Sequence, residues 1–322
     1  MTNKRKKKSR PASRPSGYRD PTPAATPARR RGLLDTMFAP GTKGSTTMPR
    51  VRTALTRGVV TVLGSPVILI APIVFLLLVW LVLIAIGYQG PFAPLANLLA
   101  LPPVGTSVDG SLATGLFGLR GGQLAIVGFL AVRAVVLAFL TASVVEALED
   151  GRVTTACIRR AIRALPVTFA VCIIGVGILT LSSFFGVLLG PGLGLLLQVG
   201  ALVVGLYLFV FAPVIAVDEG RTMPEALGRS IRAARMPGAG NLMLAALYVV
   251  PSIAVIVAPG EPGSLMGVNP TIGAWVFVLV INLLHVVMLA AFAFRYLSVA
   301  HEVPEPPVRS PVTEERVRGR RR

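Results

Sequence analysis

Histidine and cysteine are nearly absent from this chain, and acidic residues are scarce. Its 322 residues include two histidines, two cysteines and 14 Asp and Glu residues, against 32 Lys and Arg residues. Two cysteines are too few for a disulfide framework, and two histidines cannot build a His-rich metal site. Nucleophile elbows and phosphate-cradling glycine loops are missing as well. We therefore expect a protein that is not an enzyme and that needs no cofactor or metal.

Apolar residues make up most of what is present. They account for 53% of the chain, charged residues for only 14%, and the mean hydropathy is +0.73. Water cannot cover so much apolar surface, which excludes an ordinary soluble protein. The net charge is nevertheless +18. This combination is typical of an integral membrane protein with basic cytoplasmic loops.

Six long apolar segments predict six transmembrane helices in an all-α fold. Most of them approach the roughly 20 residues that are needed to cross about 30 Å of hydrocarbon. Pro251 interrupts the fifth segment, which predicts a kinked helix because neighbouring helices can satisfy the freed backbone groups. The segments are residues 66–87, 123–147, 167–186, 193–217, 242–258 and 272–299.

Two terminal stretches, residues 1–49 and 303–322, are basic and poor in apolar residues. Such composition cannot offset chain entropy, so we expect disordered tails on either side of a membrane domain at 50–302. The long polar leader before the first apolar segment also argues against a cleaved signal peptide. The KRKKK run at 4–8 could contact anionic lipid, or it could be only a solvated topology signal.

Arginines alternate between the connections of the six segments. They concentrate in the second and fourth connections and in both tails, whereas Arg120 is the only basic residue of the other connections. Cytoplasmic loops are the ones that carry an excess of Lys and Arg. We therefore predict a multi-pass protein of the plasma membrane with both termini in the cytoplasm.

Two short basic segments, 69 positions apart, share one design. Residues 148–165 read LEDGRVTTACIRRAIRAL, and residues 217–235 read VDEGRTMPEALGRSIRAAR. Each predicts an acidic–glycine turn followed by a short amphipathic helix at the cytoplasmic interface. Thr222 and Glu225 also fit a capping box. The arginines expected to contact lipid phosphates are Arg159, Arg160 and Arg163 in the first segment and Arg229, Arg232 and Arg235 in the second.

The helical period places Arg229, Arg232 and Arg235 on one side of the second segment, opposite Leu227 and Ile231. A weaker third copy, residues 50–66, precedes the first apolar segment. The three copies predict a threefold tandem repeat of an interfacial helix plus a helical hairpin. The alternative is that any cytoplasmic loop of an arginine-rich membrane protein has this pattern.

The stretch FAPVIAVDEGRTMPEALGRSIRAAR, residues 211–235, resembles a loop of bacterial six-helix membrane proteins. Its shared features are an apolar run, an acidic–glycine turn and an EAL-x-R-S motif, with weaker likeness across 50–300. The group includes the membrane domain attached to some glycerophosphodiester phosphodiesterases. The resemblance implies a bacterial inner-membrane protein and carries over no catalytic residue. Only a basic tail follows residue 299, so phosphodiesterase activity is not expected.

Arg133 is the least expected polar residue, because it lies near the middle of the second apolar segment. A central arginine costs about 2.5–3.5 kcal/mol on insertion scales, so it should face protein or a water-filled cavity. Asn282 and His285 lie on one face near the middle of the sixth segment and are its available partners. The three residues predict either a midplane polar site for an anionic headgroup or a small solute, or a contact that pins two helices together.

The loop at 88–121 contains PFAPLANLLALPP, which is apolar yet too short to span. We expect it to form an interfacial or re-entrant cap over the outer face.

Two functions remain. The first is a scaffold or assembly factor that binds anionic lipids, membrane-protein partners or further copies of itself, with nucleic acid not expected as a partner. The second is a transporter or lipid-translocating channel that uses Arg133, Asn282 and His285. Replacing Arg133 with Leu should be tolerated by a scaffold and should abolish function in a transporter.

Overall fold

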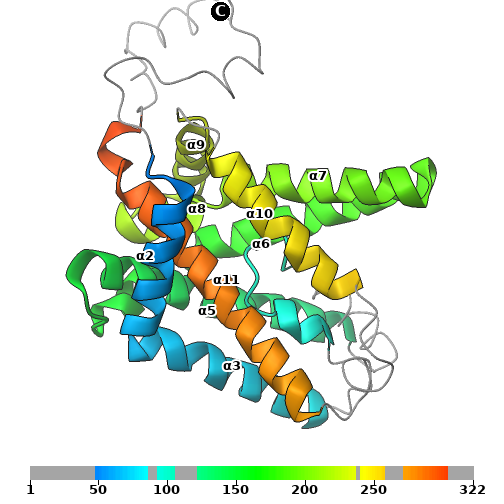
Figure 1. The fold of residues 1–322 in the computed structure, drawn as a ribbon, viewed down its shortest axis with the longest axis horizontal. Coiled ribbons are helices and arrows are strands. Elements are labelled where there is room, and N and C mark those ends of the chain that lie inside the picture. Colours follow the sequence, from blue (N-terminus) through cyan, green and yellow to red (C-terminus); the bar gives the residue numbers. More distant parts are fainter. Residues whose placement is uncertain (1–47, 86–92, 106–121, 237–239, 258–270, 304–322) are drawn as a thin grey trace, which may run out of the picture.

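The computed structural model describes residues 48–85, 93–105, 122–236, 240–257 and 271–303, and in these ranges the chain is helical without a strand (Figure 1). Nearly all of both predicted tails and much of the predicted outer loop lie outside the described residues. Five helical spans are long and apolar enough to cross a membrane. The chain is therefore a multi-pass membrane protein.

The spans and the remaining helices follow one another closely along the chain. The spans are α3 (Pro66–Ala85), α5 (Gly122–Asp150), α6 (Ala156–Leu189), α7 (Pro191–Phe209) continued by α8 (Ala212–Asp218), and α11 (Ile272–Leu297). The other helices are α2 (Val51–Gly64), α9 (Met223–Ala234) and α10 (Gly240–Val257), with short 3-10 turns η1 (Ala93–Asn97) and η2 (Ala300–Glu302). Helix α10 is apolar but shorter than the five spans.

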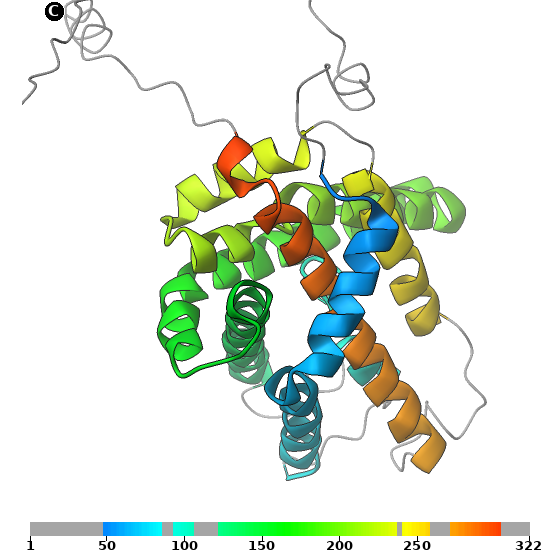
Figure 2. The ribbon, with the colours of Figure 1, turned by 60° about the vertical axis from the view of Figure 1, so that its left-hand side comes forward.

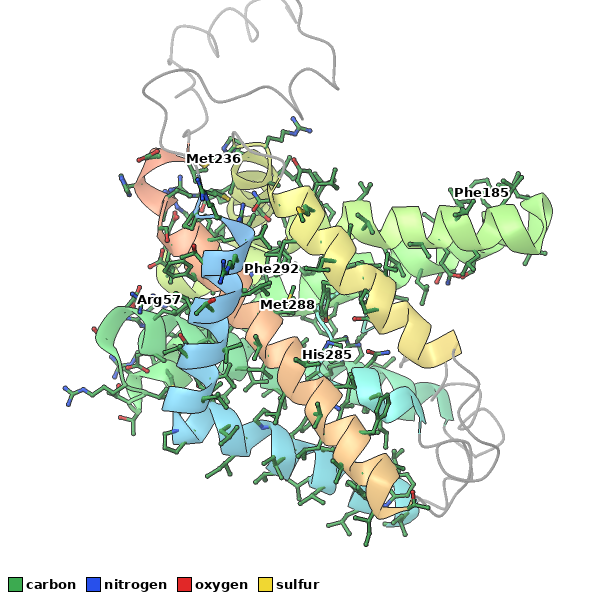
Figure 3. The ribbon with its side chains drawn as sticks, viewed as in Figure 1. Arg57, Phe185, Met236, His285, Met288 and Phe292 are labelled. Carbon is green, nitrogen blue, oxygen red and sulfur yellow. The ribbon has the colours of Figure 1, made fainter. Side chains whose placement is uncertain are left out.

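The helix ends gather on two opposite sides of the molecule. In Figure 1 the α5–α6 turn, α9 and the end of α11 lie toward the left, and the α6–α7 tip and the ends of α3 and α10 lie toward the right. From a second direction, Figure 2 again shows the end of α11 beside α9 and the α6–α7 tip on the far side. Figure 3 places Phe185 at the far tip of the α6–α7 hairpin and Arg57 on the opposite side, on α2.

Helix α2 is a separate element that crosses the direction of α3 (Figure 1) and packs against α11. Gly58 permits this contact, because a Cβ there would stand 2.6 Å from the carbonyl oxygen of Val287. The helix ends at Gly64, and Ser65, directly before Pro66, has the extended backbone that is favoured for a residue before proline.

The prediction of a separate interfacial helix within residues 148–165 is wrong. Residues 156–165 are the first turns of α6, which runs without interruption through Pro166. The missing proline N–H costs one hydrogen bond, which a long membrane helix tolerates. The second predicted helix is confirmed as α9, which begins with the predicted capping box of Thr222 and Glu225.

Both acidic–glycine turns use the left-handed backbone region. Gly151 has φ 71° and Gly220 has φ 64°, and glycine adopts such angles without a side-chain clash. These turns let α5 and α8 end and the next helix start after only a few residues.

The fourth predicted span, residues 193–217, is broken into α7 and α8 by a turn at Val210 and Phe211. Pro213 cannot donate to the carbonyl four residues earlier, which accounts for a break at this position. Helix α8 is nevertheless buried from Ala212 to Val217 and lies in the core beside α5 and α6.

Of the two predicted forms of the outer loop, interfacial and re-entrant, the described part, residues 93–105, fits the re-entrant one. Every residue from 95 to 105 is buried, and the segment packs against α10 and α11. We name residues 93–105 the re-entrant segment. Its position explains why a stretch too short to span is so apolar.

Candidate functional site: the polar anchor of the re-entrant segment

Asn282 satisfies backbone groups of the re-entrant segment. Non-helical backbone at membrane depth has no water to bond with and must find its partners within the protein. The side chain of Asn282 accepts a hydrogen bond from the N–H of Leu99 at 2.9 Å and donates to the carbonyl of Leu95 at 2.8 Å. It also donates to the carbonyl of Val278 in its own helix. One asparagine of α11 therefore holds two points of the segment.

His285, one turn further along α11, holds the segment through both ring nitrogens. Its Nε2 lies 2.9 Å from Oδ1 of Asn97 and 3.1 Å from the carbonyl oxygen of Ala96. Since both partners are acceptors, Nε2 carries the proton. Its Nδ1 lies 3.0 Å from the hydroxyl of Tyr248, which in turn accepts from the N–H of Leu101 at 2.7 Å. The geometry assigns a neutral imidazole that accepts from Tyr248.

Arg133 reaches the same segment from α5. It is fully buried, and its Nη2 donates to the carbonyl of Ala100 at 2.8 Å. Gly105 leaves room for the guanidinium, because a Cβ at that position would overlap with it. The structure thus brings Arg133, Asn282 and His285 together on one stretch of backbone.

Helix α10 completes this anchor. The side chain of Asn97 donates to the carbonyl of Ser252 at 3.1 Å, and the Ser252 hydroxyl donates to the carbonyl of Tyr248 at 2.8 Å. Asn97 and Tyr248 were not predicted as site residues. The signal for both was a hydrogen-bonding side chain inside a predicted apolar stretch, the same signal that identified Arg133.

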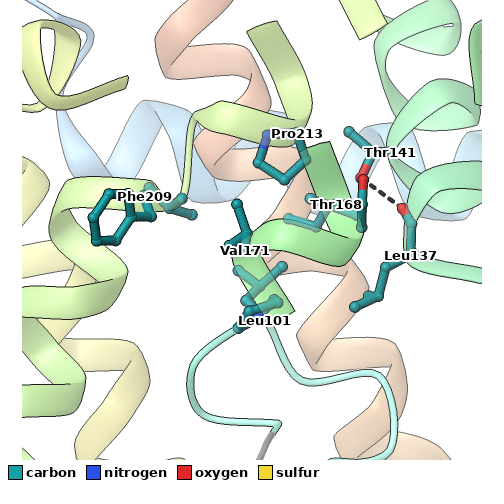
Figure 4. Close-up of a pocket in the computed structure, with 10 residues that line it drawn as sticks. Leu101, Leu137, Thr141, Thr168, Val171, Phe209 and Pro213 are labelled. Atoms are coloured by element: carbon teal, nitrogen blue, oxygen red, sulfur yellow. Dashed lines mark hydrogen bonds between the residues drawn. The ribbon is translucent and has the colours of Figure 1, made fainter. Parts of the chain in front are cut away.

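A small cavity lies beside Leu101 and Pro102 of the re-entrant segment (Figure 4). Its volume is about 10 Å³, which is room for no more than about one water molecule. Leu101 faces two hydroxyls across it, and both donate to their own helices, Thr141 to Leu137 at 2.6 Å and Thr168 to Ala164 at 3.2 Å. This cavity is too small to be a solute pathway.

The arginines predicted to meet lipid phosphates divide into exposed and buried ones. Arg159, Arg163 and Arg235 are exposed, and Arg232 is half-buried. Arg160 forms an ion pair with Glu149 at 2.6 Å. The exposed pair on α6 stands beside Ile158 and Ile162, which are 51% and 68% exposed and therefore form one mixed basic and apolar surface.

Arg229 lies inside the protein, not at a surface that lipid phosphates could reach. It is 7% exposed, and its Nε donates to Glu219 at 2.7 Å and to the hydroxyl of Tyr296 at 3.0 Å. Its Nη2 donates to the carbonyl of Ala300 at 2.8 Å. Burial lowers the pKa of Arg229, but the Tyr296 hydrogen bond and the Glu219 charge outweigh burial, so the net shift is upward.

Arg229 is buried, unlike the exposed arginines, because it lies on the face of α9 that packs against the rest of the protein. Small residues, Ala226, Ser230 and Ala233, pack toward the core, and Arg229 lies among them. The predicted division into an arginine side and an apolar side of this helix is therefore wrong at Arg229. Leu227 and Ile231 are only half-buried.

A second anchor at the end of α11 was not predicted. Arg295 is 2% exposed and donates to Oδ1 of Asn241 at 2.9 Å and to the carbonyl of Pro49. The side chain of Asn241 donates to the sulfur of Met48. These contacts join the start of the described chain to the beginning of α10 and the end of α11.

Within the described ranges, no group of three or more His, Cys, Asp or Glu residues is placed to hold a metal ion. Comparisons with protein-family models, with curated proteins and with solved structures find no match. The resemblance to bacterial six-helix membrane proteins therefore stays a prediction.

Proposed function

We propose that this chain is a non-enzymatic membrane scaffold or assembly factor that binds anionic lipids at its cytoplasmic surface. The observation that carries the proposal is the surface formed by Arg159 and Arg163 with Ile158 and Ile162 at the start of α6. Arginine beside exposed aliphatic side chains fits the boundary between headgroups and acyl chains. Arg52 and Arg57 with Val60 and Leu63 repeat this combination on α2. We name both sets together the arginine surface.

On α2, Arg52 and Arg57 are exposed, and Val60 and Leu63 are 57% and 67% exposed. This helix crosses the direction of α3 (Figure 1), as an interfacial helix would. Two separate helices therefore present the same chemistry, which supports a role in lipid contact.

Six membrane spans are part of this proposal, with α10 as the sixth. Helix α10 has 18 residues, which at 1.5 Å per residue is about 27 Å and close to the hydrocarbon thickness. The bonds of Arg295 to Pro49 and Asn241 hold the chain before α2 beside the end of α11. An even number of spans is needed to place both ends on one side, and the arginine distribution makes that side cytoplasmic.

The threefold repeat is supported by the buried faces of three helices. In each copy two small residues four positions apart are buried. These pairs are Ala54 with Gly58, Cys157 with Ala161, and Ala226 with Ser230.

Two similar ion pairs add to this support. Arg160 and Arg229 stand 69 positions apart, and each binds a glutamate of the acidic–glycine turn that precedes it. The partners are Glu149 for Arg160 and Glu219 for Arg229.

A transporter or lipid-translocating channel is the second candidate, and the re-entrant segment favours it. Non-helical backbone at membrane depth is common at ion and substrate sites. The hydrogen bonds of Asn282 and His285 are, however, used to hold the segment, and the cavity beside Leu101 has room for about one water. These two observations favour the scaffold.

Native mass spectrometry of the protein in lipid nanodiscs tests the proposal. We expect anionic lipid to copurify, and the double variant Arg159→Gln/Arg163→Gln should lose most of it. The matched control is Arg159→Lys/Arg163→Lys, which keeps the charge and should retain the lipid. Equal anionic lipid in all three proteins would overturn the lipid-binding role. A small solute that disappears only with Arg133→Leu would instead favour transport.

A further inference from the structure

A groove runs between α10 and α11, and its volume is about 230 Å³. Its apolar wall is formed by Leu247 and Pro251 of α10 and by Ile281, Leu284 and Met288 of α11. Figure 3 shows His285 and Met288 on the part of α11 that passes beside α10. Leu247 and Leu284 are 50% and 51% exposed, so the groove is open to the side of the molecule.

The polar residues at the groove, Tyr248, Ser252 and His285, already have partners in the protein. Tyr248 accepts from Leu101 and bonds to His285, the Ser252 hydroxyl donates to the carbonyl of Tyr248, and His285 reaches Asn97. Their hydroxyl hydrogens and both imidazole nitrogens are thus used within the protein, and only hydroxyl lone pairs of the buried Tyr248 and Ser252 remain as acceptors. The occupant is therefore recognised mainly by hydrocarbon contact.

The size of the groove fits one hydrocarbon chain. An apolar cavity of about 150 Å³ stays dry and binds a small hydrocarbon, whereas pockets for drug-sized molecules begin at about 300 Å³. The groove lies beside the middle of α11, which is one of the five long apolar spans, so its mouth faces the acyl region of the bilayer.

From these observations we infer that the groove between α10 and α11 binds a single acyl chain of a membrane phospholipid. The site lies at a different depth from the arginine surface, and it does not depend on the proposed scaffold role. A chain bound here would pack on Tyr248, Ser252 and His285, the residues that anchor the re-entrant segment. Occupancy of the groove should therefore stabilise that anchor.

The test uses the full-length protein in phosphatidylethanolamine and phosphatidylglycerol vesicles doped with a phospholipid that carries a diazirine on its acyl chain. After irradiation, labelled peptides are quantified by mass spectrometry. We expect labelling to concentrate on residues 247–252 and 281–288. Leu284→Trp fills the groove and should lower this labelling about tenfold, since steric misfit in an apolar pocket is that costly.

Val280→Trp is the matched control. Val280 is 47% exposed on the same helix, one turn from Leu284, and does not line the groove. This variant should keep the labelling of the wild-type protein. If Leu284→Trp does not fold, Leu247→Trp fills the groove from α10 and decides the matter in the same way. Labelling spread evenly over the exposed spans, or labelling that neither filling variant reduces, would overturn the inference.

Discussion

Arg133 has a backbone partner that its sequence position could not reveal. The sequence shows an arginine in an apolar span, which predicts a buried partner, and it offers Asn282 and His285 as candidates. The structure brings all three to the re-entrant segment, where Arg133 donates to Ala100. A carbonyl partner could not be predicted, because every residue has a carbonyl and only the fold decides which one is near.

The structure changes the expectation for Arg133→Leu from tolerance to destabilisation. The leucine would leave the buried carbonyl of Ala100 without this donor, and hydrogen bonds to charged groups contribute about 1.5–3 kcal/mol. We expect a clear drop of the unfolding temperature in detergent. Val135→Leu, at a 50% exposed position of the same helix, is the control and should change little. An unchanged unfolding temperature for Arg133→Leu would contradict the anchoring role.

Gly105 provides an independent test of the same contact. A Cβ at this position would overlap with the Arg133 guanidinium and stand 2.6 Å from the carbonyl oxygen of Ala100. Gly105→Ala should therefore destabilise the protein. At Gly200 of α7 a Cβ meets nothing within 4 Å, so Gly200→Ala should be neutral or stabilise by up to about 1 kcal/mol. Thermal unfolding of the two variants side by side decides the question, and equal shifts would argue against a close approach.

At the scale of helices, sequence periodicity predicted which elements form better than it predicted which residues they contact. The capping box of α9 was predictable because both partners lie within one turn. The buried position of Arg229 was not, because Glu219, Tyr296 and Ala300 come from other elements. Likewise, Pro166 could end a helix or lie inside one, and only the packing of α6 decides which.

Two arginines of the α9 region should respond differently to substitution. Arg229→Ala would leave Glu219 and Tyr296 without their partner, which should destabilise by about 2–3 kcal/mol, between the values for exposed and for fully buried ion pairs. Arg235→Ala, at an exposed position, should change stability by no more than about 0.5 kcal/mol. Urea unfolding in detergent measures both. The assignment fails if the Arg235 variant is the less stable one.

Gly58 tests the packing of α2 on α11. A Cβ there would stand 2.6 Å from the Val287 carbonyl oxygen and 3.1 Å from the Ala291 nitrogen, both backbone atoms that cannot move independently. Gly58→Ala should loosen α2 and raise hydrogen exchange in residues 51–64. Gly64→Ala is the control, because a Cβ at Gly64 meets nothing within 4 Å. Unchanged exchange in the Gly58 variant would mean that α2 can shift along α11 without cost.

For the molecule as a whole, hydropathy predicted a multi-pass helical protein, and the described helices confirm that class. Hydropathy left open whether the loop at 88–121 is interfacial or re-entrant, and the burial of residues 95–105 in the protein fits the re-entrant form. It also left α10 undecided, since Pro251 and its modest length weaken the signal. Whether α10 is a sixth span can therefore be determined by finding on which side of the membrane each turn lies.

Cysteine accessibility in intact cells can determine that topology. Both native cysteines are buried, and replacing them with alanine removes any background from Cys157 and Cys172. In that protein Arg152→Cys, in the α5–α6 turn, should react with a membrane-impermeant maleimide only after permeabilisation, because arginine-rich turns are cytoplasmic. Leu189→Cys, at the 52% exposed tip of the α6–α7 hairpin, should react in intact cells. A cysteine at the exposed Arg50, directly before α2 and next to the Pro49 carbonyl that Arg295 of α11 binds, should behave like the one at Arg152. Reaction of the Arg50 variant in intact cells would place the start of α2 outside and contradict six spans with cytoplasmic termini.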